Sequence, residues 1–175
     1  MMRLAITIAF GTTIAGCATY PSPVERVTLI DPALGERATT TCSRAGPENP
    51  TRFFTPTPRE VTAIESAAMR LLRSRADEYR ALLPDSNGVE PGPFDWPNEP
   101  ALYARQYIGY YENGRRMIYG NYYPAQFRSD PGEPLVLCDG GYTLFGVEYD
   151  VESRSVRRIA FDGSLRGPLL PPIEP

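Results

Sequence analysis

The sequence contains neither histidine nor lysine, and all 18 of its basic residues are arginine. Without histidine it cannot form a Ser-His-Asp or Cys-His catalytic site, or a metal centre with histidine ligands. Without lysine it cannot form a Schiff base or supply the phosphate-binding lysine of a P-loop. Acidic residues number 21, which gives a formal net charge of −3 and no overall positive field that would attract nucleic acid.

Motifs of nucleotide and hydrolase sites are also missing. No glycine-rich phosphate loop follows an expected strand, and Gly-x-Ser-x-Gly does not occur. We therefore expect no cofactor and no bound metal, and we favour a non-enzymatic protein. What is present suffices for a folded chain of 175 residues, of which 42% are apolar and 22% charged. These values are typical of one globular domain.

An apolar stretch lies close to the N-terminus. It runs from Leu4 to Ile14, after a single positive charge at Arg3. A bilayer span needs about 20 apolar residues, so this stretch is too short to cross a membrane, but it has the length of the apolar part of a signal peptide. It ends in the sequence Ile-Ala-Gly-Cys at 14–17, which is an aliphatic residue, two small residues and a cysteine.

This four-residue motif resembles the lipobox of bacterial lipoproteins. The resemblance implies that residues 1–16 are removed as a signal peptide and that Cys17 is lipidated with acyl chains such as palmitate. Two or three acyl chains anchor a protein stably to a membrane. The next residue, Ala18, is not the aspartate that retains lipoproteins at the inner membrane. The resemblance therefore implies the periplasmic face of the outer membrane of a two-membrane bacterium, the alternative being an ordinary secretory signal with an unrelated cysteine.

Two cysteines remain besides the lipidated one. In an exported protein Cys42 and Cys138 are expected to form a disulfide, because the compartment is oxidising. The alternative is two separate buried thiols. An active redox pair is not expected, since no Cys-x-x-Cys motif is present.

The remainder of the chain is expected to form one domain between two short extensions. We expect a tether at 17–23, a single globular α+β domain at 24–166 and a proline-rich tail at 167–175. Segment 24–30 alternates loosely between apolar and polar residues, which indicates a first strand, and a second short strand is expected at 39–42.

The clearest element is a helix over 58–83. Thr57 and Glu60 fit an S/T-x-x-E capping box, with Pro58 at the first helical position. Apolar residues then recur with helical spacing, and Pro84 ends the pattern. The opposite face is predicted either to be solvated or to form a basic strip that meets lipid phosphates or an acidic partner. Its residues are Arg59, Arg70, Arg73, Asp77 and Arg80.

The apolar period changes to two in the second half of the chain, which is typical of strands. Segments 103–111 and 116–123 flank Asn113-Gly114, the strongest local signal for a two-residue type I′ hairpin. Further strands are expected at 134–138, 142–149 and 155–161.

This order of elements predicts an α+β fold in which one long helix packs on a curved antiparallel sheet of four to five strands. The order resembles the cystatin-like or NTF2-like arrangement. Proteins with these folds include inhibitors, binding modules and enzymes, so the resemblance implies no single function.

A hairpin face rich in tyrosine and arginine is the candidate binding surface. If the helix covers one face of the sheet, the other face would present large amphipathic side chains to a protein or a glycan. Alternatively, a helix or the loop around Phe94 and Trp96 covers these residues, and that loop either docks into the core or binds a ligand itself. The candidate residues are Tyr103, Arg105, Tyr107, Tyr111, Arg116 and Tyr122.

The lipid anchor and this surface together predict a non-enzymatic envelope lipoprotein that binds another envelope protein as an inhibitor, immunity or assembly factor. One alternative is a protein that binds cell-wall glycan. Another is a glycan hydrolase that uses carboxylates near the single tryptophan, such as Asp95 and Glu99. Asp139, Glu148 and Asp150 offer a further carboxylate cluster, although Asp-Gly is also a common turn pair.

Overall fold

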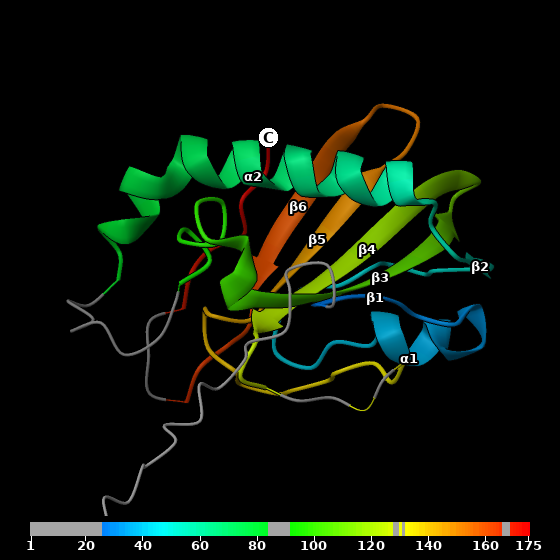
Figure 1. Ribbon diagram of the computed structural model, residues 1–175, viewed down its shortest axis with the longest axis horizontal. Coiled ribbons are helices and arrows are strands. Elements are labelled where there is room, and N and C mark those ends of the chain that lie inside the picture. Colours follow the sequence, from blue (N-terminus) through cyan, green and yellow to red (C-terminus); the bar gives the residue numbers. More distant parts are fainter. Residues whose placement is uncertain (1–25, 84–91, 128–129, 131, 166–168) are drawn as a thin grey trace, which may run out of the picture.

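The computed structural model describes residues 26–83, 92–127, 130, 132–165 and 169–175, so the expected tether and Cys17 lie outside the described residues. It is a mixed α and β fold with a six-stranded sheet, one long helix of 23 residues and few other helices (Figure 1). The helices are α1 (Gly35–Thr39) and α2 (Pro58–Arg80), with short 3₁₀ helices at Pro32–Leu34 and Pro100–Leu102. The strands are β1 (Val27–Leu29), β2 (Phe53–Phe54), β3 (Tyr103–Glu112), β4 (Arg115–Pro124), β5 (Phe145–Asp150) and β6 (Ser155–Phe161).

The sheet has the order β1-β3-β4-β5-β6, and β2 pairs with the C-terminal half of β3. The long strands β3 to β6 are antiparallel neighbours, as predicted. β1 joins the same sheet but runs parallel to β3, so the prediction of a wholly antiparallel sheet is wrong at this edge. Parallel pairing is allowed here because α2 lies between β1 and β3 in the chain and makes the connection long enough.

The long helix α2 begins at the predicted capping box. The Glu60 backbone N–H donates to the Thr57 hydroxyl at 3.3 Å, and the Thr57 backbone N–H donates to the Glu60 carboxylate at 2.8 Å. The helix ends at Arg80, earlier than predicted. The N–H groups of Leu82 and Leu83 bond to carbonyls three residues back, so the chain tightens into 3₁₀ geometry there.

The strands β3 and β4 form the predicted hairpin. Asn113 and Gly114 have φ values of 50° and 80°, as a type I′ turn requires. The turn sets the register, which places Tyr110 opposite Met117. Successive side chains therefore alternate between the two faces of the sheet, and each face has its own cover.

One face of the sheet is covered by α2, which crosses the strands in Figure 1. The core beneath it is aromatic: Trp96, Tyr122 and Phe145 are fully buried, and the Trp96 and Tyr122 ring centroids lie 4.8 Å apart. Phe94 is buried as well, so the loop that carries it and Trp96 docks into the core. The buried residues of α2 are Val61, Ile64, Ala67, Ala68, Leu72 and Tyr79.

The opposite face is covered by the N-terminal segment with α1 and by residues 132–138, which lie below the sheet in Figure 1. Its smaller core is built around Ile108 and Tyr119. Cys42 and Cys138 belong to the two covering segments and form the predicted disulfide across 96 positions of sequence. The bond therefore ties the two parts of this cover together.

The short strand predicted at 39–42 is wrong. Thr39 is instead the last residue of α1. The Thr40 backbone N–H bonds back to two carbonyls of α1, at 3.0 and 3.3 Å. The Thr40 N–H is therefore satisfied at the end of α1 and is not available for pairing with a strand.

The strand predicted at 134–138 is also wrong, because side chains take the place of a neighbouring strand. The Leu135 backbone N–H donates to Gln106 Oε1, and its carbonyl accepts from Asn121 Nδ2, both at 2.8 Å. Backbone groups that are satisfied in this way need no strand ladder.

The last two predicted strands are present. β6 has the predicted bounds, whereas β5 begins at Phe145 rather than at 142. The delay has a local cause: the Leu144 N–H bonds to the Gly141 carbonyl at 3.1 Å and closes a turn before the strand.

The segment predicted as a proline-rich tail, 167–175, packs on the sheet in its described residues. Ile173 is buried and exchanges two backbone hydrogen bonds with Ile159 of β6, at 2.8 and 2.9 Å. Leu170 is buried in the core on the α2 side. Prolines suit a short segment at the edge of a sheet, where few backbone donors are needed.

Candidate functional site

The residues predicted as a binding surface lie mostly inside the molecule, so the alternative that other elements cover them holds for four of the six. Tyr103, Tyr107 and Tyr122 are 0% exposed, and Arg105 is 4% exposed. The Tyr107 hydroxyl donates to Glu65 of α2 at 2.8 Å, and Arg105 pairs with the same carboxylate at 3.1 Å. Burial raises the pKa of Tyr107 well above its usual value, with further contributions from Tyr122 and Glu65, so its hydroxyl remains a neutral donor.

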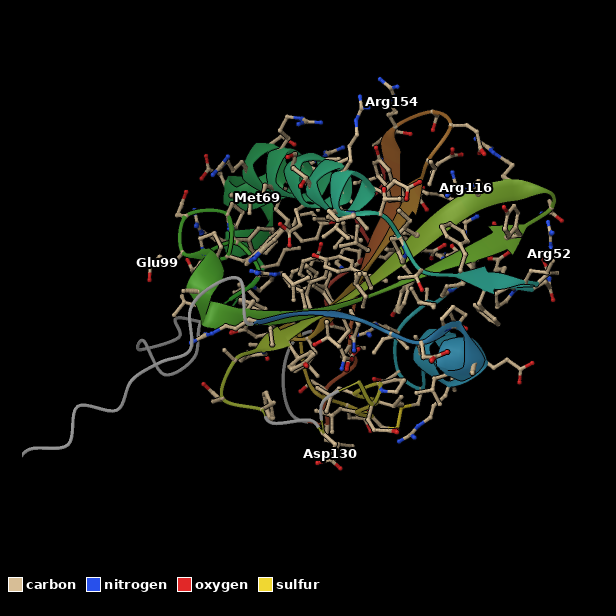
Figure 2. All side chains as sticks on the ribbon, turned by 45° about the vertical axis from the view of Figure 1, so that its right-hand side comes forward. Arg52, Met69, Glu99, Arg116, Asp130 and Arg154 are labelled. Atoms are coloured by element: carbon tan, nitrogen blue, oxygen red, sulfur yellow. A yellow bond between two sulfur atoms is a disulfide. The ribbon has the colours of Figure 1, made fainter. Side chains whose placement is uncertain are left out.

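The other two candidates, Tyr111 and Arg116, lie near the tip of the β3–β4 hairpin and are half-buried. The Arg52 guanidinium lies 4.3 Å from the centre of the Tyr111 ring, and that of Arg116 lies 4.6 Å from the centre of the Phe54 ring. Arg116 also pairs with Glu60 at 2.9 Å. Figure 2 shows Arg52 and Arg116 at this end of the molecule. The six predicted residues therefore do not form one surface.

The physical reason is that both faces of the hairpin are covered. Side chains of β3 alternate between the two faces of the sheet, so those of residues 103, 105 and 107 lie on the face that α2 covers. Tyr122 and Phe145 lie on the same face. The opposite face is covered by the N-terminal segment with α1 and by residues 132–138, which the disulfide links to that segment. An accessible site must therefore lie elsewhere.

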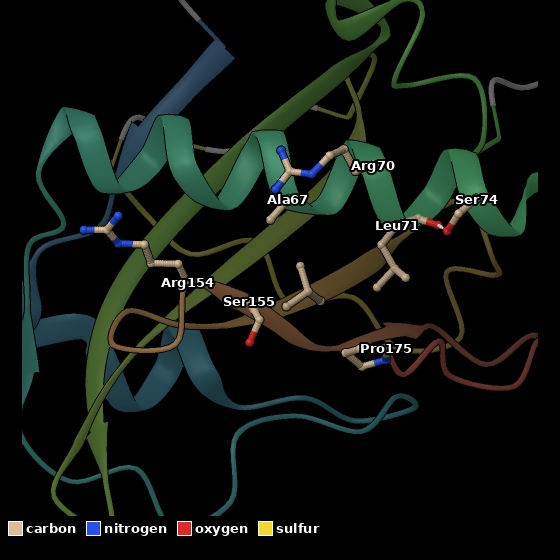
Figure 3. A pocket seen from close by; sticks show the side chains of 8 residues that line it. Ala67, Arg70, Leu71, Ser74, Arg154, Ser155 and Pro175 are labelled. Atoms are coloured by element: carbon tan, nitrogen blue, oxygen red, sulfur yellow. Dashed lines mark hydrogen bonds between the residues drawn. The ribbon is translucent and has the colours of Figure 1, made fainter.

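An accessible groove lies between α2 and the β5–β6 hairpin, and we call it the helix–hairpin groove. It consists of two hollows of about 370 and 330 Å³ that share Arg154. The first hollow, shown in Figure 3, is lined by Ala67, Arg70, Leu71, Ser74, Arg154, Ser155, Val156 and Pro175. The second is lined by Arg59, Glu60, Ala63, Tyr149, Val151 and Arg154.

Helical spacing aligns the α2 residues of this groove. Positions 59, 63, 67, 70 and 74 recur every three or four residues, so their side chains share one edge of the helix. The small alanines at two of these positions leave room above the strands. The other wall consists of the β5–β6 turn and the first residues of β6.

Three arginines of the groove lack a partner in the part of the chain that the structure describes. No hydrogen bond, ion pair or ring contact holds the side chains of Arg59, Arg70 and Arg154, and all three residues are exposed. Figure 3 shows Arg70 on α2 and Arg154 on the hairpin turn. Guanidinium groups bind carboxylates and phosphates through charge-assisted hydrogen bonds. The groove is therefore suited to an anionic ligand.

The basic strip predicted on α2 is divided in the structure. Arg73 and Arg80 each donate to a backbone carbonyl of the loop that carries Trp96, at 2.5 and 3.2 Å. These two arginines hold that loop against the helix, whereas the arginines at 59 and 70 line the groove. Sequence reasoning missed Arg154, which joins them from a hairpin much later in the chain.

Arg154 adopts a left-handed backbone conformation with φ of 55°. A residue other than glycine costs roughly 1–2 kcal/mol in this region, and glycine or asparagine is usual in such turns. An arginine at a position that disfavours it points to a role for its side chain.

The groove also contains one phenol and one carboxylate. Tyr149 is 2% exposed, and burial raises its pKa, although the charges of Arg154 and Arg70 act in the opposite direction. Burial alone would raise the pKa of Glu60, but hydrogen bonds from Thr57 and the charge of Arg116 outweigh it and lower the pKa. Glu60 is thus already occupied by the capping box and an ion pair, and the groove remains positive.

Glu60→Gln should make stability less dependent on pH in the acid range. Because the folded-state pKa is lowered, the ionised carboxylate stabilises the fold above its ordinary value of 4.5, and this contribution is lost as the pH falls through the folded-state pKa. Glutamine preserves the capping box but does not titrate. Urea unfolding should show a loss of about 0.5–1 kcal/mol at pH 7 that vanishes near pH 2.5. An equal loss at both pH values would contradict the lowered pKa.

A buried network of charges lies on the sheet face opposite α2. Glu148 is 2% exposed and accepts hydrogen bonds from Arg157, Arg158 and Tyr110. Arg157 also pairs with Glu112. Every charge of this network has a counter-charge, so we assign it to the fold rather than to a reactive site.

A second network holds the disulfide region on the same face. Arg44 donates to Tyr119 at 3.0 Å, to Asp162 at 2.7 Å and to Asn121 at 2.6 Å. Burial raises the pKa of Asp162, while the charge of Arg44 acts in the opposite direction. Cys42 precedes Arg44 by two positions, so this cluster fixes the cover that the disulfide closes.

Two of the carboxylates considered for catalysis, those of Asp95 and Asp150, have structural roles. Asp95 accepts from the Gly92 backbone N–H at 3.0 Å and lies 3.6 Å from Arg80. Asp150 accepts from two N–H groups of the turn that follows it, and Asp139 has the left-handed φ of a turn residue, 57°. Across the described ranges, no group of three or more histidine, cysteine, aspartate or glutamate residues is arranged to hold a metal. The hydrolase alternative stays a prediction.

No protein-family model, curated protein or solved structure matches the chain. Within the residues that the structure covers, no helix is both long and apolar enough to cross a bilayer. The groove and the N-terminal motif are therefore the features on which a function can rest.

Proposed function

We propose that this protein is a non-enzymatic lipoprotein of the cell envelope that binds another envelope protein through the helix–hairpin groove. The observation that carries the proposal is the presence of Arg59, Arg70 and Arg154, without partners among the described residues, on the walls of one groove. Arginines that become desolvated beside apolar contacts are a common source of binding energy at protein interfaces.

The lipobox at 14–17 supports the envelope part of the proposal. Lipid on Cys17 would hold the domain at the periplasmic face of the outer membrane. Roles as an inhibitor, an immunity factor or an assembly factor all need a binding surface and no chemistry, and the net charge of −3 speaks against nucleic acid as a partner. A cystatin-like arrangement of the long helix on the sheet is compatible with each of these roles.

Photocrosslinking in the source cells tests this function. p-Benzoylphenylalanine in place of Ser74, on the rim of the groove, should give an adduct with one abundant envelope protein. The same replacement at Thr62, which is exposed on α2 outside the groove, is the matched control and should give none. Arg154→Gly should reduce the yield of the adduct two- to fivefold without loss of stability, because glycine tolerates the left-handed backbone.

Two results would contradict the proposal in different ways. An adduct whose yield is undiminished in both Arg154→Gly and Arg70→Gln would show that the partner does not use the groove. The lack of any protein adduct at Ser74 would contradict the protein-binding function itself.

A further variant tests the lipid anchor. Cys17→Ser should lose most of the adduct, because the unlipidated domain is no longer held beside an envelope partner.

A further inference from the structure

We infer that the helix–hairpin groove receives an extended acidic segment of the partner, in which carboxylates alternate with small apolar side chains. The inference rests on the proposed function and names the part of the partner that is recognised.

The charge of the groove calls for several anionic groups. Its three arginines lack counter-charges among the described residues, and the carboxylate that lines the groove, Glu60, is engaged by Thr57 and Arg116. The planar guanidinium can bind a carboxylate through two parallel hydrogen bonds. An occupant that supplies two or three carboxylates would satisfy the whole set.

The length of the groove favours a linear occupant over a compact one. Arg59 and Arg70 are separated by eleven positions of α2, or about 16 Å along the helix axis. A single phosphate or carboxylate can reach only one end of that distance. An extended polypeptide covers it in about five residues, at roughly 3.3 Å per residue.

The floor of the groove favours a polypeptide over a uniform polyanion. The apolar side chains that line the two hollows are those of Ala63, Ala67, Leu71, Val151 and Val156. Side chains of an extended polypeptide alternate between two sides. One side can therefore place small apolar groups on this floor while the other turns carboxylates towards the arginines on the rim.

The neighbouring strand edge already accepts extended chain. β6 is the last strand in the order of the sheet, and Ile173 exchanges two backbone hydrogen bonds with Ile159 on its outer side. Pro175, two positions later, lines the first hollow with Ser155, as Figure 3 shows. An extended segment in the groove would thus lie beside backbone that already packs in extended form.

Selection from a displayed library of random twelve-residue peptides tests the inference, with the full-length protein in detergent micelles as bait. The enriched peptides should carry at least two aspartates or glutamates at alternate positions. Fluorescence polarisation of the most enriched peptide should show binding that weakens two- to fivefold in each of Arg59→Gln, Arg70→Gln and Arg154→Gly, and roughly 10- to 100-fold in the triple variant. Binding should also weaken between about 50 and 300 mM salt.

The matched control is Arg75→Gln. Arg75 is on the same helix but outside the groove, and it pairs with Glu78. Its replacement changes the net charge by the same amount as each test variant, so affinity for the peptide should stay unchanged. A loss equal to that of the groove variants would overturn the inference, because overall charge rather than the groove would then explain binding.

Two further results would overturn the inference. One is enrichment of peptides without acidic residues, or equal binding by the triple variant. The other is arginine-dependent binding to phosphatidylglycerol vesicles or to purified peptidoglycan sacculi without selection of acidic peptides, which would assign the groove to phosphate or glycan. If a cellular protein adduct still forms at Ser74, the proposed function stands and only the inference of an acidic segment is overturned. If neither the adduct nor the selection of acidic peptides is observed, the proposed function and the inference are both overturned.

Discussion

Replacing Cys42 and Cys138 together with serine should lower the free energy of unfolding by about 4–5 kcal/mol. The bond closes a loop of 96 positions, and the chain-entropy model assigns roughly this loss to opening it. For a domain of this size the midpoint temperature should fall by roughly 10–15 °C, measured by scanning calorimetry. Wild-type protein in reductant should show the same fall, because both treatments remove the bond.

The loss of stability should be localised on the sheet face opposite α2. Ser43, next to the bond, accepts hydrogen bonds from the backbone N–H groups of Asp139 and Gly163 at 2.9 and 3.2 Å. Hydrogen exchange at these two amides should accelerate in the double variant, while amides of α2 keep their relative protection. A loss below about 1 kcal/mol would show that the contacts of Ser43 and Arg44 hold this cover without the bond.

Elements whose causes lie within a few residues could be predicted from the sequence. The capping box of Thr57 and Glu60 marked the start of α2, and Asn113-Gly114 fixed the turn and register of the β3–β4 hairpin. The disulfide followed from counting, because only two cysteines remain after Cys17. Each of these signals works without knowledge of the rest of the fold.

The cover on the second face of the sheet could not be predicted in this way. Residues 132–138 lie there because Gln106 and Asn121 bind the Leu135 backbone with their side chains. Such contacts join parts of the chain that no local pattern relates. From local patterns alone the hairpin is predicted to have one free face, and this prediction assigns tyrosines of the core to a surface.

The groove shows the same limit at a finer scale. The helical pattern predicts that Arg59 and Arg70 lie on an exposed face of the helix. It predicts the same for Arg73 and Arg80, but these two arginines bind backbone carbonyls of another loop. Which arginines remain without partners depends on where that loop docks. The position of Arg154 beside the helix depends on how the β5–β6 hairpin packs against α2. The docking of the loop and the packing of the hairpin are both tertiary contacts, which no local sequence pattern specifies.

Glu148→Ala should lower the free energy of unfolding by about 3 kcal/mol, the second largest loss that we expect. The carboxylate is 2% exposed and accepts hydrogen bonds from Arg157, Arg158 and Tyr110. Its removal leaves Arg157 paired with Glu112 and leaves Arg158 without an ion pair among the described residues. A charge that stays partly buried without a counter-charge is strongly destabilising. Urea unfolding at pH 7 measures the loss, and Glu174→Ala, at an exposed position, should change stability by less than about 0.5 kcal/mol.

The double variant Glu148→Leu, Arg158→Leu separates charge from packing. If the uncompensated arginine causes the loss, replacing it as well should recover about 1–2 kcal/mol relative to Glu148→Leu alone, since apolar replacement of both partners is often close to neutral. No recovery would place the loss in the packing of the Glu148 side chain. Because the helix–hairpin groove draws on none of these residues, a folded Glu148 variant should still bind the partner. That result would separate the charges that hold the sheet together from the three arginines that we assign to binding.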